Sequence, residues 1–256
     1  MIDKRIVCWW SGGITSAVAC KLAVDKWGAI PVFIETGAHH PDTQRFKKDC
    51  EKWYGCEILQ LQSKFKDHFD VVQKLRYVNG PAGARCTGVL KRNVREKWEK
   101  TQNIDGYVWG FEFAKKELKR AERLKDTTPD YEHLFPLIEE KLTKPDCIKI
   151  VQDAGIEVPA MYKLGFHNNN CIGCVKGGMA YWNLVRKHFP EHFEKMAKLE
   201  REIGRSCIRK YFLDELPKDA GRGQPPLVRE CGASGEGCTT TTSREYFEER
   251  AEVEKE

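Results

Sequence analysis

Cysteine is the residue type in this sequence whose spacing most clearly suggests chemistry. Cys171 and Cys174 form a Cys-x-x-Cys pair in a segment rich in Asn and Gly. Two thiolates at this spacing can bind one metal centre. Cys86 follows Arg85 and precedes Lys91 in the chain, and these cationic neighbours favour its thiolate form. These three cysteines are therefore candidates for metal binding or sulfur chemistry.

The other cysteines separate into two groups. The chain has eleven cysteines, and we expect no disulfide framework because this count is odd and the cytosol is reducing. Five lie in apolar or amphipathic contexts and are interpreted as small core residues, namely Cys8, Cys20, Cys50, Cys56 and Cys147. Three more lie near Gly or Arg or close to one another and stay candidates for chemistry, namely Cys207, Cys231 and Cys238.

The segment SGGITS, residues 11–16, lies between a predicted strand and a predicted helix. Its glycines allow tight turning, and its hydroxyls and the helix amino terminus can hold a phosphate or pyrophosphate. The alternative is a simple turn with a helix cap. The segment lacks the Gly-Lys-Ser ending of the Walker loop, which excludes an ordinary P-loop NTPase. The candidate nucleotide-binding residues here are Ser11, Gly12, Gly13, Thr15 and Ser16.

Strands and helices alternate along the first half of the chain. This order predicts an α/β fold with a parallel sheet and helices on both faces, in which ligands bind at the carboxyl ends of the strands. The predicted strands are residues 5–10, 29–36, 57–61 and 107–111, and the predicted helices are residues 16–26, 41–54, 67–77 and 90–101.

The second half of the chain has a different pattern. Residues 138–154 and 179–203 have helical periodicity, whereas residues 217–243 are rich in Gly, Pro, Ser and Thr and predict a loop. The sequence therefore predicts a nucleotide-binding α/β domain over 1–135, a helical part with the Cys-x-x-Cys loop over 136–216, and a flexible cysteine-containing tail over 217–256.

Composition limits the partners of the protein. The chain has 256 residues with 43 basic and 38 acidic side chains, so the net charge of +5 suits an anionic small molecule or a nucleic acid. A nucleic-acid partner is possible, but no separate basic module is evident. No apolar run reaches the ~20 residues of a membrane span, and no signal peptide is visible. We expect a cytoplasmic protein without a membrane partner, and the sequence leaves the oligomeric state open.

A second segment, ETGAHHPDTQRF at residues 35–46, follows the second strand directly. Together with SGGITS it resembles the PP-loop signature of the adenine-nucleotide hydrolase and phosphoadenosine-phosphosulfate (PAPS) reductase superfamily. RCTGVLK at residues 85–91, Gly110-Phe111, the stretch 135–165 and CIGC at residues 171–174 are similar to later family segments, in the same order. The resemblance covers about residues 5 to 190 and implies a Rossmann-like nucleotide-binding fold.

The resemblance implies further contacts to an adenine nucleotide, either ATP or adenylyl sulfate. Arg side chains bind such anionic groups well through paired hydrogen bonds. His39 and His40 either contact phosphate or ribose or belong to an exposed, capped loop. The additional candidate nucleotide-binding residues are Glu35, Thr36, Gly37, Lys91, Gly110, Arg120 and Arg123.

The resemblance also favours an iron–sulfur centre of the 4Fe-4S type over the alternative, zinc. Such a cluster normally takes four thiolates, whereas four Cys ligands also suit zinc. Cys86, Cys171 and Cys174 are the implied ligands, and Cys238 is assigned to the remaining position. Cys231 or Cys207 could replace Cys238 there, or the position could stay open for substrate sulfide.

The segment Arg229–Gly232 resembles the Glu-Cys-Gly segment that carries the reductase nucleophile, which makes Cys231 the candidate catalytic residue. The implied activity is thiol-dependent reduction of an adenylylated sulfate to sulfite, with a thiol reductant such as thioredoxin. One alternative is an ATP-dependent sulfurtransferase that acts on a tRNA base or another nucleic-acid acceptor. A second alternative is a regulator that binds nucleotide and cluster without turnover.

Overall fold

The computed structural model of the protein describes residues 4–80, 83–228 and 231. The chain folds into two compact units, and each is assembled from two separate segments. Unit 1 comprises Met1–Lys64 and Asn93–Ile172, and unit 2 comprises Phe65–Arg92 and Gly173–Glu256. Among the described residues, every helix is too short or too polar to cross a bilayer.

Unit 1 is built on a sheet of five parallel strands in the order β3-β2-β1-β4-β5. This arrangement confirms the predicted α/β class. The first strand, β1, lies in the centre of the sheet. The next two strands, β2 and β3, extend the sheet to one side, and the chain then crosses back over β1 to add β4 and β5 on the other side. The strands are β1 (Ile6–Trp9), β2 (Ile30–Glu35), β3 (Leu59–Gln62), β4 (Gly106–Val108) and β5 (Glu132–Leu134).

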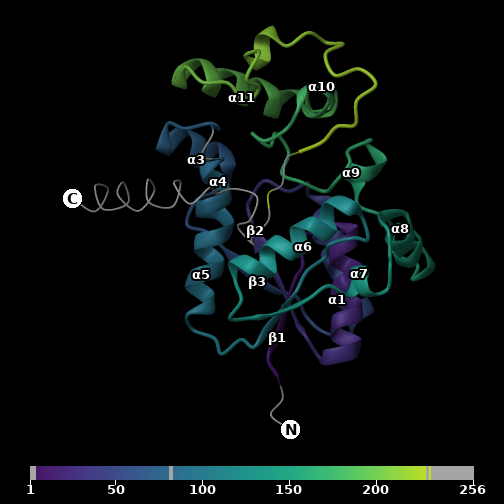
Figure 1. Ribbon diagram of the computed structural model, residues 1–256. Helices are drawn as coiled ribbons and strands as arrows, with labels where there is room; N and C mark the ends of the chain where they lie inside the picture. The colour runs from purple at the N-terminus through teal and green to yellow at the C-terminus, as the bar shows by residue number, and fades with distance from the viewer. Residues whose placement is uncertain (1–3, 81–82, 229–230, 232–256) are drawn as a thin grey trace. The chain divides into compact units, whose positions relative to one another are not determined.

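One face of the sheet packs against α1 (Ile14–Trp27), which also contacts α2 (Asp42–Tyr54), α7 (Pro136–Glu139) and α8 (Lys144–Asp153) (Figure 1). Successive strand residues point to opposite faces, so alternate residues of β1 enter this core. The largest fully buried side chains of the core include Trp10, Phe33 and Phe46, and the Trp10 ring contacts the rings of the other two.

The opposite face of the sheet carries aromatic side chains from β1 and β4. Trp9, Tyr107 and Trp109 lie together there, and the guanidinium of Arg95 lies 5.2–5.9 Å from their ring centroids. Arg95 belongs to α5 (Asn93–Glu99), so this short helix covers the second face. Cation–π contacts of this kind are favourable where solvent is excluded.

Cys8 of β1 and Cys20 of α1 form a disulfide. Both are buried in the core, as their apolar context predicts, but our expectation of free thiols at these positions was wrong. The strand and the helix are adjacent along the chain and packed together, which brings the two sulfurs into contact. Of the other cysteines interpreted as core residues, Cys50 and Cys147 are buried free thiols and Cys56 is partly exposed.

Two predicted long helices are each interrupted. Residues 138–154 give α7 and α8, which are separated by a turn in which Thr143 and Asp146 form a capping box. Residues 179–203 give α10 (Met179–His188) and α11 (Pro190–Ile203), because Pro190 lacks an N–H and begins a new helix. The segments β5, α6 (Lys115–Thr127) and α9 (Ala160–Lys163) complete unit 1.

Unit 2 is helical in its described part. Its second helix is three residues long and continues into a π-helical turn, an irregularity that occurs mostly at functional sites. Helix α11 contacts α10, α3 and η2. Besides α10 and α11, the elements are α3 (His68–Leu75), α4 (Arg85–Thr87), the π-helix η1 (Gly88–Arg92) and the 3-10 helix η2 (Leu213–Glu215).

The core of unit 1 makes a first prediction. Phe46 has no exposed surface and packs against Trp10, so Phe46→Ala should lower the free energy of unfolding by about 3–5 kcal/mol through lost burial and a cavity. Phe113→Ala is the matched control, since Phe113 is 39% exposed and should cost under about 1 kcal/mol. Urea unfolding followed by tryptophan fluorescence measures both. Equal losses in the two variants would contradict the assigned core.

Candidate functional site

The SGGITS segment forms a tight loop between the end of β1 and the start of α1. Gly12 has φ +80°, a left-handed conformation that favours glycine. Ser16 Oγ accepts a hydrogen bond from the Ser11 backbone N–H at 3.0 Å and donates to the Gly13 carbonyl at 2.8 Å. The loop is thus fixed by its own hydroxyl and ends at a helix amino terminus, where backbone N–H groups and the helix dipole attract anions.

Gly110, just beyond the end of β4, lies against the backbone of this loop. A Cβ atom at Gly110 would lie 2.6 Å from Ser16 Cα and 2.8 Å from Ser16 N. No other residue type fits there without displacing the loop. The role of Gly110 is therefore steric, because its missing side chain lets the carboxyl ends of β1 and β4 converge on one site.

Two side chains from the segment after α8 hold the loop from outside. The Tyr162 hydroxyl accepts a hydrogen bond from the Ile14 N–H at 3.3 Å. Asn169 is buried, and its amide Nδ2 donates to the Gly12 carbonyl at 2.8 Å and to Thr43 Oγ1 at 3.0 Å. The sequence analysis assigned neither side chain to the site. Tyr162, in α9, belongs to the family-like stretch 135–165, but that resemblance did not indicate a contact to the loop, and Asn169 has no motif of its own.

The predicted residues Glu35, Thr36 and Gly37 follow β2 and form a hydrogen-bonded turn. Glu35 Oε1 accepts from the Gly37 N–H at 2.8 Å and from His39 Nδ1 at 2.9 Å, and Glu35 Oε2 accepts from Gln44 Nε2 at 3.0 Å. Burial raises the pKa of Glu35, but the hydrogen bond and charge of His39 and the backbone N–H groups outweigh it, so the pKa is lowered. Glu35 therefore stays ionised and braces the turn, and the His39 ring is buried against it.

Cys171 also lies in unit 1, at the carboxyl end of β2. Its Sγ shares a hydrogen bond of 3.2 Å with Thr36 Oγ1, and the next residue, Ile172, donates its N–H to the Ala38 carbonyl at 2.8 Å. The first cysteine of the Cys-x-x-Cys pair is thus brought next to the turn after β2, although the two are far apart in sequence.

The two predicted arginines of α6 differ in their surroundings. Arg120 donates to Glu117 at 3.1 Å, and its guanidinium lies 4.1 Å from the centroid of the Phe111 ring, whereas Arg123 is exposed. Arg120 is the more constrained of the two, because both partners restrict the guanidinium.

Glu112 and Lys144 are two further charged residues near this edge that sequence reasoning did not single out. Burial raises the pKa of Glu112, and burial lowers the pKa of Lys144, whose ammonium donates to the His167 carbonyl and to Asn168 Oδ1. Glu112 Oε2 is buried and has no hydrogen-bond partner in the described part of the chain. Perturbed groups of this kind are typical of functional sites.

Unit 2 contains a second group of candidate residues, centred on cysteine. Cys207 is buried, and burial together with the neighbouring Glu200 carboxylate raises its pKa far above the usual thiol value. Cys86 and Cys174 are buried free thiols of the same unit. Cys207 was only an alternative in the sequence analysis, because no motif surrounds it.

The buried carboxylate of Glu200 positions Cys207. Glu200 has no exposed surface and accepts backbone N–H groups from Cys207 and, at 2.7 Å, from Leu213. A buried carboxylate is tolerated only when it is well hydrogen-bonded. The turn that carries Cys207 is therefore fixed to α11 by one side chain.

Cys231, the candidate nucleophile, is partly exposed and lies beside the start of the π-helix. Its Sγ shares a hydrogen bond of 3.3 Å with Thr87 Oγ1, and its carbonyl accepts from Lys91 Nζ at 3.2 Å. Lys91 thus lies in unit 2 and contacts Cys231. Cys238 falls outside the described residues.

The fit of these thiols to a metal centre depends on donor type and on arrangement. Cys thiolates are the soft donors that suit iron–sulfur clusters and zinc, and the described part of unit 2 contains three buried free cysteines, Cys86, Cys174 and Cys207. Within residues 4–80, 83–228 and 231, however, no three His, Cys, Asp or Glu side chains are placed so that they could hold a metal ion. The donor chemistry fits such a centre, and side-chain adjustment would be needed to bind it.

With this geometry, the fold and the loop define a parallel α/β protein with a tight, glycine-containing loop at the carboxyl end of its first strand. The family model of the phosphoadenosine phosphosulfate reductase domain matches residues 5–180, well over half of the chain. The chain belongs to this family. The match confirms the resemblance to the PAPS reductase and PP-loop superfamily.

Solved structures and curated sequences extend this result. PAPS reductase from Candida auris aligns over 66% of this chain and 82% of its own, with a TM-score of 0.51 and 13% identity, so the two share a fold. A U34-tRNA thiolase from Methanococcus maripaludis, with its 4Fe-4S cluster, aligns over 81% of this chain and 75% of its own with a TM-score of only 0.41 and 16% identity.

An uncharacterized protein of Methanocaldococcus jannaschii is 25% identical over 230 residues, which cover 86% of this chain and 53% of that protein. The chain spans about half the length of the curated relatives that it matches.

The contact between Gly110 and Ser16 makes a second prediction. In Gly110→Ala the new methyl group must displace the SGGITS backbone, so adenine-nucleotide affinity should fall at least about tenfold, with a stability loss of about 1–3 kcal/mol. Gly178→Ala is the control, since its Cβ would meet only Leu227 O at 3.7 Å. Calorimetric titration with a non-hydrolysable ATP analogue measures both, and unchanged affinity in Gly110→Ala would remove the loop from the binding site.

His68 makes a pH prediction for unit 2. Its Nε2 lies 2.9 Å from the Gly173 carbonyl, and burial lowers its pKa from 6.5 to about 4. The unfolded chain binds a proton near pH 6.5, whereas the folded chain resists protonation until about pH 4. Stability should therefore fall by about 3 kcal/mol as the pH decreases through this window.

His68→Gln keeps an N–H donor for Gly173 but cannot titrate. Urea unfolding at pH 7 and near pH 4.5 should show a smaller stability difference in this variant than in the unsubstituted protein. An identical pH dependence in the two proteins would show that His68 is not the titrating group.

Proposed function

We propose that this protein binds an adenine nucleotide on the SGGITS loop and reduces an adenylylated sulfate to sulfite with a cysteine thiol. The single observation that carries the proposal is the loop itself, closed by Ser16 and packed against Gly110 in a chain of the PAPS reductase family. The loop supplies an anion site at the carboxyl edge of the sheet, where parallel α/β proteins bind ligands.

Within this proposal, Ser11, Gly12, Gly13, Thr15 and Ser16 contact the phosphate groups through backbone N–H groups and hydroxyls. Glu35, Thr36 and Gly37 shape the adjacent turn, because their polar groups are already engaged with one another and with neighbours in the structure. Arg120 and Arg123 supply positive charge for the sulfate or phosphate oxygens. Lys91 contributes charge next to Cys231 in unit 2.

The proposed reaction has two steps. The Cys231 thiolate attacks the sulfate sulfur, the bond from that sulfur to the bridging phosphate oxygen breaks, and the nucleotide leaves with both electrons. An external thiol such as thioredoxin then attacks Cys231 Sγ and releases sulfite, and the two thiols become a disulfide. Thr87 Oγ1 can donate a hydrogen bond to the Cys231 thiolate, and the Lys91 ammonium favours that ionised form.

A resident metal centre is a second part of the proposal. Cys86, Cys174 and Cys207 would hold it by donor chemistry, with Cys171, Cys231 or Cys238 as the remaining ligand. When bound, a 4Fe-4S cluster would supply charge and redox capacity near the thiols, and zinc is the alternative. A bound cation would also reverse the effect of burial on Cys207, because metal-bound thiols are deprotonated.

The gathered thiols favour one alternative function. Reduction of adenylyl sulfate requires one nucleophilic cysteine and an external thiol, whereas unit 2 holds three buried cysteines besides Cys231. An ATP-dependent sulfurtransferase would use the same phosphate loop to adenylate an acceptor such as a tRNA base, with release of pyrophosphate, and would need thiol-held sulfur for transfer.

The test begins with anaerobic purification and measurement of iron, sulfide and zinc. The protein is then assayed for sulfite release from adenylyl sulfate and from its 3′-phosphorylated form with thioredoxin, and for pyrophosphate release from ATP with tRNA. We expect sulfite, and in Cys231→Ser a rate lower by about a thousandfold or more with nucleotide binding retained. Cys56→Ser is the control, since Cys56 is partly exposed in unit 1.

Pyrophosphate release with thiolated tRNA, and no sulfite, would replace the reductase by the sulfurtransferase. Nucleotide binding without consumption of either substrate would favour a regulator. For the metal centre, Cys174→Ser and Cys207→Ser should each lower the metal content, and unchanged iron and zinc in both variants would remove these residues from the ligand set.

A further inference from the structure

The turn after β2 contains a histidine, His39, that has no role in the function proposed above. Its side chain is only 5% exposed, so it does not belong to an exposed loop. The ring packs against Phe33 with a centroid distance of 5.2 Å, and its Nδ1 lies 2.9 Å from Glu35 Oε1 and 3.3 Å from Thr36 Oγ1. An apolar contact and a carboxylate therefore hold the imidazole in one orientation.

The contact with Glu35 decides which ring nitrogen carries the proton when His39 is neutral. Burial raises the pKa of Glu35, but the hydrogen bond and charge of His39 and the backbone N–H groups lower it below its usual value. Glu35 is thus ionised, and an ionised carboxylate only accepts hydrogen bonds. The proton is therefore on Nδ1, which donates to Glu35, and Nε2 carries the lone pair.

Nε2 of His39 is available to a ligand, whereas Glu35 is not. Glu35 Oε1 accepts from the Gly37 N–H as well as from His39, and Oε2 accepts from Gln44. Nε2 has no hydrogen-bond partner in the described part of the chain, and it is not one of the partnerless side-chain atoms that are enclosed by protein. The small exposed part of the ring therefore includes this acceptor.

The pair of Glu35 and His39, called the dyad below, follows the strand next to the nucleotide loop. Strand β2 pairs with β1, whose carboxyl end leads into SGGITS. Asn169 connects the two segments, because its amide donates both to the Gly12 carbonyl and to Thr43 Oγ1, near the start of α2. A ribose is joined directly to its phosphate, so the ribose of a nucleotide on the loop must lie close to these segments.

The strand order supplies an independent argument for the ribose. The order β3-β2-β1-β4-β5 is shared with dinucleotide-binding α/β proteins, in which the first loop holds phosphate and an acidic residue at the end of the second strand binds a ribose hydroxyl. Glu35 occupies that position here, but both of its oxygens already accept hydrogen bonds. The acceptor that remains at this position is His39 Nε2.

We propose that His39 Nε2 accepts a hydrogen bond from a ribose hydroxyl of the bound nucleotide, an inference that rests on the proposed binding of a nucleotide to SGGITS. A hydroxyl fits this atom because it can donate, whereas an ionised phosphate oxygen only accepts. Glu35 is a positioning residue, since it orients the ring and fixes its proton on Nδ1.

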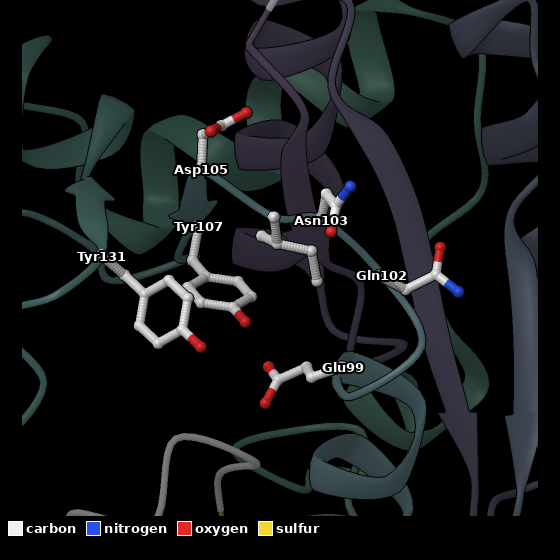
Figure 2. Close-up of a pocket in the computed structure, with 7 residues that line it drawn as sticks. Glu99, Gln102, Asn103, Asp105, Tyr107 and Tyr131 are labelled. Atoms are coloured by element: carbon white, nitrogen blue, oxygen red, sulfur yellow. The ribbon is translucent and has the colours of Figure 1, made fainter.

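A cavity of about 320 Å³ next to the amino end of β4 does not offer such a subsite (Figure 2). Because all five strands are parallel, it lies at the opposite edge of the sheet from SGGITS. The carboxylates in its lining already have protein partners, since Arg95 donates to Glu99 and the Arg5 backbone N–H donates to Asp105. The ribose contact is therefore assigned to the dyad.

The test is calorimetric titration with a non-hydrolysable ATP analogue and its 2′-deoxy and 3′-deoxy forms. The unsubstituted protein should bind the ribonucleotide at least about tenfold more tightly than one of the deoxy forms, because loss of the hydroxyl leaves Nε2 without a donor. His39→Phe keeps a ring against Phe33 but offers no acceptor. In this variant ribonucleotide affinity should fall about tenfold and the preference should disappear.

A purely structural role of His39 gives a different result, since it would weaken binding of all three nucleotides equally and leave the preference unchanged. Glu35→Gln is the second variant. It keeps the size of the side chain but not its charge, so the tautomer of the ring is no longer fixed and the preference should decrease. His192→Phe is the matched control, because its ring packs between Phe69 and Phe189 in unit 2, and it should retain the full preference.

Equal binding of the three nucleotides by the unsubstituted protein, or an unchanged preference in His39→Phe, would overturn the ribose contact and leave nucleotide binding by the loop intact. If His39→Phe does not fold, as judged by urea unfolding, an unchanged preference in Glu35→Gln overturns it instead. Absence of binding of all three nucleotides would refute the proposed function, and the ribose contact with it.

Discussion

The close approach of Gly110 to Ser16 is the constraint on which the candidate nucleotide site depends. Two backbones meet there at a distance that no side chain allows, and the meeting brings the carboxyl ends of β1 and β4 to one loop. Tyr162 and Asn169 can form their hydrogen bonds to the loop because this contact places the loop backbone beside them. Their segment, far along the chain, then brings Cys171 to the same edge of the sheet.

Unit 2 buries several thiols and one carboxylate away from water. Glu200 is fully buried and accepts hydrogen bonds from backbone N–H groups, and these bonds fix the turn at Cys207 to α11. Burial raises the pKa of the Cys207 thiol far above its usual value, so this thiol resists ionisation. The metal ion or cluster proposed for unit 2 would place positive charge beside these thiols and favour their ionised form. The described side chains are not arranged around such a centre.

The sequence predicted β1, β2 and β4 because their residues lie in short apolar runs, and it located the loop because PP-loop residues are consecutive. The more exposed β3 was predicted as well. It predicted less where structure depends on contacts between distant segments. No motif indicates the role of Asn169 or Cys207. The strand β5 has the sequence EHL, which lacks an apolar run, whereas the equally short β4 continues into an apolar segment. The Cys8–Cys20 disulfide could not be predicted from an odd cysteine count and a reducing compartment, because it depends on the packing of α1 against β1.

Strand β4 has only three residues, yet it carries Tyr107, and Gly110 follows two residues after its end. At about 3.3 Å per residue, the two positions are separated by about 10 Å of extended chain. The strand is hydrogen-bonded on both sides, to β1 and β5, and this pairing fixes its register. The register in turn sets the position of Gly110 against Ser16. Adding or removing one residue in β4 would therefore move Gly110 by about 3.3 Å and open the contact that holds the loop.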